Sequence, residues 1–319
     1  MLRFFHRRWF LILLAAVFGA GFSFPQMLKP AADGVPREWI VSTVLFLTAL
    51  PLESRVMWQA VRHPKAVLLA VAMNFGLLPL LAWATSAGLR PDMASGLMIA
   101  AAAPCTLASA AVWTRRAGGN DAVAILVTMV TNLSCFLVTP FWLLVSTGQS
   151  EVRLDPFSMT TRLALLVVTP TVLAQLIRLH RPAGAWATRH KVPLAVAAQC
   201  GILTMVFVGA TGAGLKLASR EIVVGWLDWV TMPAATLGVH LAILFTGHGL
   251  GRMLGVGRED RIAVGFAGSQ KTLMVGLDVS LKYFAHQPLA VLPMIVYHVG
   301  QLVVDTVVAD RLRRRHPVA

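Results

Sequence analysis

Residues 262–281 read Ile-Ala-Val-Gly-Phe-Ala-Gly-Ser-Gln-Lys-Thr-Leu-Met-Val-Gly-Leu-Asp-Val-Ser-Leu, an apolar stretch with Lys271 near its middle. Arg261 lies ten residues before Lys271 and Lys282 lies eleven after it, so a bilayer-spanning helix would place the ammonium near the midplane. A charge at that depth costs about 3 kcal/mol on insertion scales. The polar, glycine-bearing run at 268–272 predicts a helix that is interrupted there, at a functional depth of the membrane.

The whole chain has the composition of an all-α polytopic membrane protein. Hydrophobic residues make up 57% and charged residues 13% of its 319 residues, which predicts one integral membrane domain and no soluble domain. Hydropathy predicts ten membrane-spanning helices of about 17–25 residues each. They are expected near residues 9–25, 39–52, 66–86, 93–114, 121–146, 160–179, 192–212, 229–250, 261–281 and 286–308. The first follows Arg3, Arg7 and Arg8 without a small-residue cleavage site, so we interpret it as a retained helix rather than a signal peptide.

The basic residues follow the expected topology of these spans. The chain carries a formal net charge of +14. If the N-terminus is cytoplasmic, the segments on that side hold nineteen Lys and Arg residues, the other side holds eight, and Lys271 completes the total of 28. The positive-inside rule then predicts a multi-pass protein of the cytoplasmic membrane with both termini in the cytoplasm. We therefore expect membrane lipid around the chain, no nucleic acid partner and no obligate protein partner.

The sequence lacks the patterns that indicate an enzyme or a metal site. Cys105, Cys135 and Cys200 fall within predicted spans without Cys-X-X-Cys or zinc spacing, so we expect packing cysteines. The chain also lacks a His-Glu-X-X-His pattern, a Gly-X-Ser-X-Gly elbow and a Walker loop. We predict no enzymatic activity, no metal centre and no cofactor.

The ten spans divide near residues 151–156 into two halves, 1–150 and 151–319. Because five is an odd number, the second half enters the membrane in the opposite sense, which is the inverted repeat of many secondary transporters. The fourth span of each half carries a polar interruption. Residues 103–109 read Ala-Pro-Cys-Thr-Leu-Ala-Ser, and residues 268–273 read Gly-Ser-Gln-Lys-Thr-Leu.

Each interruption disfavours a continuous helix for a local reason. Pro104 has no amide hydrogen and clashes with the preceding turn, while Gly268 adds backbone freedom. The freed carbonyls and amides need partners that lipid does not supply. Two broken helices that cross could provide those partners and cradle an ion or an anionic substrate. A simple proline kink at Pro104 is the alternative interpretation.

Four stretches carry a resemblance to a known family. They are 103–110, the Gly-Gly-Asn-Asp run at 118–121, 269–273, and the Pro-Met-Ile-Val-Tyr-His run at 293–298 with Gln301. Their order and spacing across nearly the whole chain resemble the bile acid:sodium symporter superfamily, and within it the SBF-like branch around the seventh human bile-acid transporter.

The resemblance implies a fold and an activity. The fold would hold ten helices in two inverted five-helix repeats, with broken helices four and nine crossing in a core of helices 3–5 and 8–10. A panel of helices 1, 2, 6 and 7 would lie beside the core, and substrate would bind between them. The implied function is secondary active transport of an organic anion or similar small amphipathic solute by alternating access. The alternative is a membrane regulator of calcium homeostasis without solute flux of its own, since eukaryotic relatives are associated with that process.

The resemblance also implies candidate ion- or substrate-binding residues. In sodium-coupled members, a helix-nine glutamate before a Gln-Asn pair serves two sodium sites, together with a helix-three glutamine and small polar residues of helices four and five. The matching candidates here are Asn74 in helix three, Thr106 and Ser109 in helix four, Thr128 in helix five, and Gln270 and Thr272 in helix nine. Two positions depart from the pattern, because Phe266 stands at the glutamate position and Lys271 replaces the asparagine.

These departures disfavour sodium as the bound ion. Sodium needs several oxygen ligands and, inside a membrane, usually a carboxylate to offset desolvation. Three hypotheses remain for Lys271. It is a structural lysine that binds carbonyls of the broken helices, or its ammonium replaces one sodium ion, or it takes up and releases a coupling proton, since burial disfavours the charged form of lysine.

Two further charged or titratable residues are candidate relays. Asp278 lies seven residues after Lys271, and we expect either a partly solvated helix-end charge that pairs with Lys282 or a group that reaches Lys271 through water. His298 lies within the last span, with Gln301 one turn on, and is either a satisfied interior histidine or a cleft and relay residue.

The remaining polar residues of the last spans receive structural interpretations. His240 shares no metal-binding spacing with a carboxylate, so we interpret it as a packing residue. Asp305 and Asp310 are expected to pair with the Arg cluster at 311–315.

Overall fold

The computed structural model describes residues 2–147, 155–219 and 224–314, and within these ranges the chain is helical and has no strands. The boundary expected between residues 150 and 151 lies outside the described residues. The α-helices of more than 20 residues are α1 (Leu2–Ser23), α9 (Asp121–Thr147), α13 (Lys191–Ala218), α14 (Trp226–Met253) and α17 (Val291–Arg314). The shorter ones are α2 (Pro25–Asp33), α3 (Arg37–Ala49), α4 (Ser54–Ala60), α5 (Pro64–Ala72), α6 (Leu78–Ser86), α7 (Pro91–Ala102), α8 (Ser109–Arg116), α10 (Pro156–Leu163), α11 (Thr169–Leu179), α12 (Arg181–Arg189), α15 (Arg258–Ser269) and α16 (Leu273–Tyr283). Two π-helical turns, η1 (Met73–Leu77) and η2 (Ala164–Val168), and one 3-10 turn, η3 (Pro288–Ala290), join neighbouring helices.

The protein is a multi-pass membrane protein. Six helical stretches of the described residues are long and apolar enough to span a bilayer, namely Pro64–Ser86, Asp121–Ser146, Pro156–Leu179, Lys191–Ala218, Trp226–Met253 and Pro288–Arg314. The pair Trp9–Ser23 and Pro25–Asp33, bent by 111°, makes a seventh if it counts as one span. The other expected spans lie on helices that are individually short, because α3 has 13 residues and the fourth and ninth predicted spans are each broken in two.

Both predicted interruptions are present. The first separates α7 from α8 and begins at Ala103, whose backbone is extended with ψ 154°. The second separates α15 from α16, and both Gln270 and Thr272 are extended there. The two breaks touch directly, since the Thr272 amide donates to the Pro104 carbonyl over 2.9 Å. A simple kink at Pro104 is therefore wrong.

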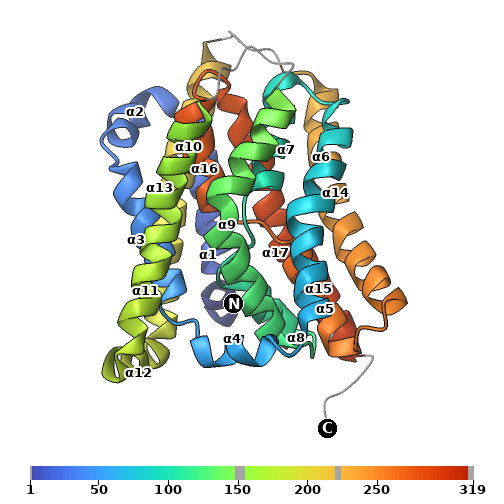
Figure 1. The fold of residues 1–319 in the computed structure, drawn as a ribbon. Helices are drawn as coiled ribbons and strands as arrows, with labels where there is room; N and C mark the ends of the chain where they lie inside the picture. Colours follow the sequence, from blue (N-terminus) through green and yellow to red (C-terminus); the bar gives the residue numbers. More distant parts are fainter. Residues whose placement is uncertain (1, 148–154, 220–223, 315–319) are drawn as a thin grey trace.

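The helices form two groups that lie side by side. Figure 1 shows α1, α3, α11 and α13 on the left and α5, α6, α14 and α15 on the right. The left group is held together by α13, which packs against α1, α2 and α3, and the right group by α15, which packs against α5, α9 and α14. The helices α4, α8 and α12 lie at the lower end of the molecule, and α2 lies at the upper end (Figure 1).

Candidate functional site

The break between α7 and α8 is supported by side chains of α9. Its carbonyl and amide groups have lost their helical partners and need replacements in an apolar interior. Asn132 Nδ2 donates to the Cys105 carbonyl over 2.8 Å, and Thr131 Oγ1 accepts from the Cys105 amide over 3.2 Å. Two threonine hydroxyls, those of Thr128 and Thr139, donate to the carbonyls of Thr106 and Ala102. Thr128, one of the predicted site residues, thus contacts the break by donating its hydroxyl to the Thr106 carbonyl.

The break between α15 and α16 is supported by α17. Tyr297 Oη donates to the Ser269 carbonyl over 2.7 Å. The Gln301 amide pairs with both backbone groups of Lys271, accepting from its N–H and donating to its carbonyl over 2.9 Å each. The same Gln301 Nε2 lies 3.1 Å from His298 Nδ1. Helix α17 therefore holds the extended segment in place with three side chains.

Lys271 is buried, with 2% of its surface exposed, and its ammonium lies among neutral oxygens. Nζ donates to the Asn74 carbonyl over 2.8 Å, to Asn74 Oδ1 over 2.9 Å and to the Ala103 carbonyl over 2.7 Å. It also lies 5.4 Å from the ring centroid of Phe75, within cation–π range. Among the described residues no carboxylate contacts it. The three N–H donors of the ammonium are thus matched by three oxygens, two from Asn74 in η1 and one from Ala103 after α7. A bound cation would be coordinated in the same way.

The π-turn η1 and Pro79 explain why the Asn74 carbonyl is free. The Leu78 amide donates to the Met73 carbonyl, one residue further back than in an α-helix. Pro79 has no amide hydrogen, so the next carbonyls along the helix lose their backbone donor. Lys271 Nζ donates to the Asn74 carbonyl instead, and Trp142 Nε1 donates to the Phe75 carbonyl over 2.7 Å. The Asn74 side chain completes the cradle, because its Nδ2 donates to the carbonyls of Ala267 and Gln270 over 3.0 Å each.

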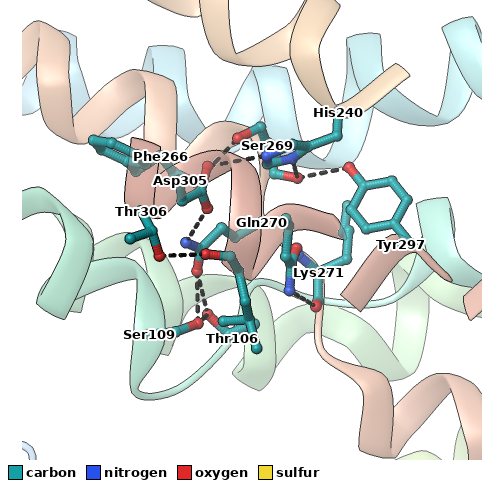
Figure 2. A network of polar contacts seen from close by, with 12 residues as sticks. Thr106, Ser109, His240, Phe266, Ser269, Gln270, Lys271, Tyr297, Asp305 and Thr306 are labelled. Carbon is teal, nitrogen blue, oxygen red and sulfur yellow. Dashed lines mark hydrogen bonds and ion pairs between the residues drawn. The ribbon is translucent and has the colours of Figure 1, made fainter. Parts of the chain in front are cut away.

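Gln270 links the two breaks to a buried carboxylate (Figure 2). Its Oε1 accepts from the hydroxyls of Thr106 and Ser109 over 2.7 Å each, and its Nε2 donates to Asp305 Oδ2 over 2.6 Å. A carboxylate can only accept, so Asp305 fixes which end of the Gln270 amide faces the hydroxyls.

Asp305 pairs with His240, contrary to the expectation from the sequence. Asp305 is fully buried, and His240 Nε2 lies 3.0 Å from its Oδ1. His240 Nδ1 lies 3.3 Å from the Ser269 carbonyl, so both ring nitrogens face acceptors and the ring makes both bonds only when both carry protons. The prediction that Asp305 pairs with the terminal Arg cluster is therefore wrong, and His240 has a polar role as well as packing (Figure 2).

Phe266 fills an apolar cluster instead of facing an ion. Its side chain is 1% exposed and packs with a small group of buried residues, namely Ala117, Leu244, Ile262 and Ala309. The carboxylate missing from this position has a counterpart from another helix, since Asp305 of α17 contacts Gln270.

A cleft of about 150 Å³ lies between α1, α3 and α13 on one side and the two breaks on the other. Its polar lining residues are Thr48, Thr106, Ser109, Gln199, Thr272 and His298, and its other lining residues are apolar. All of the lining residues are described, and none is Asp, Glu, Lys or Arg. The first residues of α8 and α16 reach the cleft, so two half-helices present their amino-terminal ends to it. Such ends carry partial positive charge and favour an anionic group.

Most of the predicted residues therefore meet at the crossing. Asn74 binds Lys271, and the hydroxyls of Thr106 and Ser109 bind Gln270. Thr272 and His298 line the cleft. Asp278 does not join them. It is 3% exposed and receives two bonds from Arg162, so its expected pairing with Lys282 and its expected partial solvation are both wrong.

Asp310 also differs from its expected pairing. It binds Arg116 of α8 with two hydrogen bonds over 2.7 and 2.8 Å. Sequence reasoning missed both this partner and the pair of His240 with Asp305. One signal was present for the buried pair, because Asp305 lies in the apolar run 302–308 and a charge there needs a nearby partner.

The chain matches the family model of the SBF-like CPA transporter family over residues 8–314. It belongs to this family. An uncharacterized protein of Pseudomonas aeruginosa is similar to this SBF-like transporter, with 29% identity over 291 residues that cover 87% of this chain and 85% of that protein. Sodium/bile acid cotransporter 7 of Xenopus tropicalis is 23% identical over 326 residues, which cover 96% of this chain and 92% of the relative. The protein of the same name from Rattus norvegicus is 23% identical over 327 residues, with 96% and 93% covered.

The family and these relatives indicate a membrane transporter of the bile acid:sodium symporter type. Membership in a transporter family implies a small-molecule substrate and transport rather than catalysis.

Proposed function

We propose that this SBF-like protein is a secondary active transporter that moves a small organic anion or similar amphipathic solute by alternating access. It would lie in the cytoplasmic membrane with both termini in the cytoplasm. Its ten spans would form two inverted repeats, residues 1–150 and 151–319. The panel would hold spans 1, 2, 6 and 7 and the core spans 3–5 and 8–10, and the two helix groups of Figure 1 support this division.

The position of the cleft supports a transport role. It lies between helices of the proposed panel, α1, α3 and α13, and the crossing of the broken helices in the proposed core. A solute held there touches both moving parts, which is what alternating access requires. The apolar lining suits an amphipathic body, and the two half-helix ends suit an anionic group.

Transport is proposed to be independent of sodium. The observation that carries this proposal is the ammonium of Lys271, which already occupies a three-oxygen position at the crossing. The buried carboxylate that contacts Gln270 supports it too, because Asp305 already accepts a hydrogen bond at each oxygen, from His240 and from Gln270. A sodium ion at Asp305 would compete with these two donors for the carboxylate.

The test is uptake by the purified protein in liposomes, preceded by a thermal-shift screen against organic anions. Uptake is measured with sodium or with choline across a series of pH values. Equal rates in both salts support replacement of sodium by Lys271, and a steep rise with an inward proton gradient would assign the coupling to a proton. Strong sodium dependence would overturn the proposal, and a protein that regulates ion homeostasis without its own flux would move no solute.

A further inference from the structure

A three-residue ion cluster joins three helices at the end of the molecule opposite α4 and α8. Arg162 of α10 donates from Nε and Nη2 to the two carboxylate oxygens of Asp278 of α16, over 3.0 and 2.7 Å. Its remaining nitrogen, Nη1, donates to Glu38 of α3. The side chains of Arg162 and Asp278 are only 15% and 4% exposed, whereas that of Glu38 is 60% exposed.

The fork of Arg162 with Asp278 connects a helix of the proposed panel to a helix of the proposed core. Arg162 and Glu38 belong to α10 and α3, which lie in the proposed panel, and Asp278 belongs to α16 in the proposed core. Two parallel hydrogen bonds between a guanidinium and a carboxylate give this contact directional strength. Separating this pair leaves the buried Asp278 without its partner and Arg162 with Glu38 alone, which is unfavourable. The proposed panel and core therefore separate at this end only if the Arg162 guanidinium and the Asp278 carboxylate find other partners.

A recess of about 280 Å³ beside the cluster carries a net positive set of side chains. Arg37, Arg162 and Lys282 line it, against the carboxylates of Glu38 and Asp278. The guanidinium of Arg162 holds the pKa of Glu38 below its ordinary range, first by the hydrogen bond and then by its charge. Of the three cations that line this recess, Arg162 is the one that binds carboxylates of both the proposed panel and the proposed core, Glu38 and Asp278.

We propose that Arg162 is an anion-binding gate residue on the outer side of the membrane. While the outer path is closed, the guanidinium stays hydrogen-bonded to Asp278. The carboxylate of an entering organic anion replaces Asp278 on the guanidinium when the path opens. Because that exchange keeps Arg162 paired, opening is favoured when the anion is present and disfavoured without it. The inference rests on the proposed function for the outward orientation and for the anionic substrate.

Accessibility of the cleft from outside tests the gate without a known substrate. A reporter cysteine replaces Ala198, which lines the cleft, in a chain with Cys200→Ser and with the buried Cys105 and Cys135 kept. Intact cells are treated with a membrane-impermeant maleimide, and the parent without the reporter provides the blank. With the gate intact, external labelling is expected to be slow. Asp278→Asn should accelerate it at least about tenfold, which corresponds to a loss of about 1.4 kcal/mol in the stability of the closed state.

The matched control is Asp33→Asn on the same side of the molecule. Asp33 pairs with Lys29 within α2, and both side chains are more than half exposed, so labelling should stay at the parent rate. If Asp278→Asn fails to fold, Arg162→Lys gives the same readout, because lysine keeps the charge and loses the fork. Unchanged labelling in the folded variants would overturn the gate.

Acetate tests the anion site. In Asp278→Ala the guanidinium loses its two-bond partner and keeps only Glu38, so acetate should raise the melting temperature more than chloride at equal ionic strength. The wild type and the double variant with Arg162→Gln should respond to both salts alike. Equal effects of acetate and chloride on Asp278→Ala would overturn the anion site.

Two marker cysteines separate a failed gate from a wrong topology. Ala31→Cys on the exposed surface of α2 should react from outside, and Met253→Cys at the end of α14 should react only after permeabilisation. Reversed markers would contradict the proposed orientation, in which case the Asp278 variants are compared again from the other side.

Discussion

A single lysine changes the chemistry of the helix crossing. Lys271 brings its own positive charge to a point where the backbone of Ala103 and both oxygens of Asn74 converge. An ammonium at that point satisfies those oxygens without an ion from solution. This geometry supports the structural lysine and the replaced sodium ion among the hypotheses for this residue, and uptake across pH values separates them from proton coupling.

Replacement of Lys271 by methionine should lower the melting temperature by several degrees. The three oxygens lose their donor, and each unsatisfied buried acceptor costs about 1–3 kcal/mol. Lys29→Met is the matched control, since its side chain is 53% exposed and exposed substitutions usually stay within about 0.5 kcal/mol. Thermal unfolding followed by intrinsic fluorescence measures both, and equal stabilities would show that the ammonium contributes nothing to the crossing.

Asp305 and Asp310 lie five residues apart on α17 and should respond differently to the same change. Asp305→Asn disrupts the hydrogen bonds that a fully buried carboxylate makes with His240 and Gln270, and each buried polar group left unsatisfied costs about 1–3 kcal/mol. Asp310→Asn removes a pair whose two side chains are each 40% exposed, with an expected cost below about 1 kcal/mol. Chemical unfolding of the purified variants gives both values. A small loss for Asp305→Asn would contradict the structural importance assigned to the pair.

At the scale of elements, the helix that carries Asn74 is shaped by a residue that neither binds nor lines the site. Pro79 removes one backbone donor, the π-turn η1 shifts the hydrogen bonds by one residue, and the Asn74 carbonyl becomes available to Lys271. Sequence reasoning found Asn74 by resemblance, but the backbone carbonyl came only from the geometry of the turn.

Pro79→Ala is expected to destabilise the protein, although proline normally costs a helix about 3 kcal/mol. The new amide at 79 can bond the Phe75 carbonyl, restore the α-helical register and turn Asn74 away from Lys271. In α14, the control Pro233→Ala should leave stability unchanged or raise it, because that helix only regains a hydrogen bond. A gain in melting temperature for both variants would contradict the role of the π-turn.

Close packing of α7 against η3 depends on one glycine. A Cβ at Gly96 would lie 2.2 Å from the Ala290 carbonyl oxygen, so Gly96→Ala must push backbone apart. A Cβ at Gly249 of α14 meets nothing within 4 Å, so Gly249→Ala should be neutral or stabilising by up to about 1 kcal/mol. Melting temperatures of the pair check this, and similar values would show that α7 and η3 can separate freely.

At the scale of the whole molecule, the structure combines a cleft below the crossing with an ion cluster above it. The cleft is lined by Phe10 of α1 and by Ala195, Ala198 and Gln199 near the beginning of α13. Figure 1 shows that α13 begins at the lower end of the molecule, where α17 also ends. The cluster of Arg162, Asp278 and Glu38 joins α10, α16 and α3 at the opposite end. Under the proposed orientation and gate, the cleft would face the cytoplasm.

The orientation makes a direct prediction about labelling from outside. Under the proposed orientation, which rests on the nineteen-to-eight distribution of basic residues, α2 would lie outside and the end of α14 inside. Ala31→Cys should therefore react with an impermeant maleimide in intact cells, and Met253→Cys should remain unlabelled until the membrane is opened. Labelling of Met253→Cys in intact cells would contradict the cytoplasmic position of both termini.

The sequence by itself determined the class of protein and the positions of the two helix breaks. Hydropathy, proline and the charge of Lys271 act locally along the chain, so residues 103–109 and 268–273 could be identified without any contact. Only the tertiary structure decided the partners. His240 meets Asp305, and Arg162 meets Asp278, across 65 and 116 residues of chain. Burial makes such charges bind whichever complementary group the helix packing brings within reach, and no local pattern specifies that group.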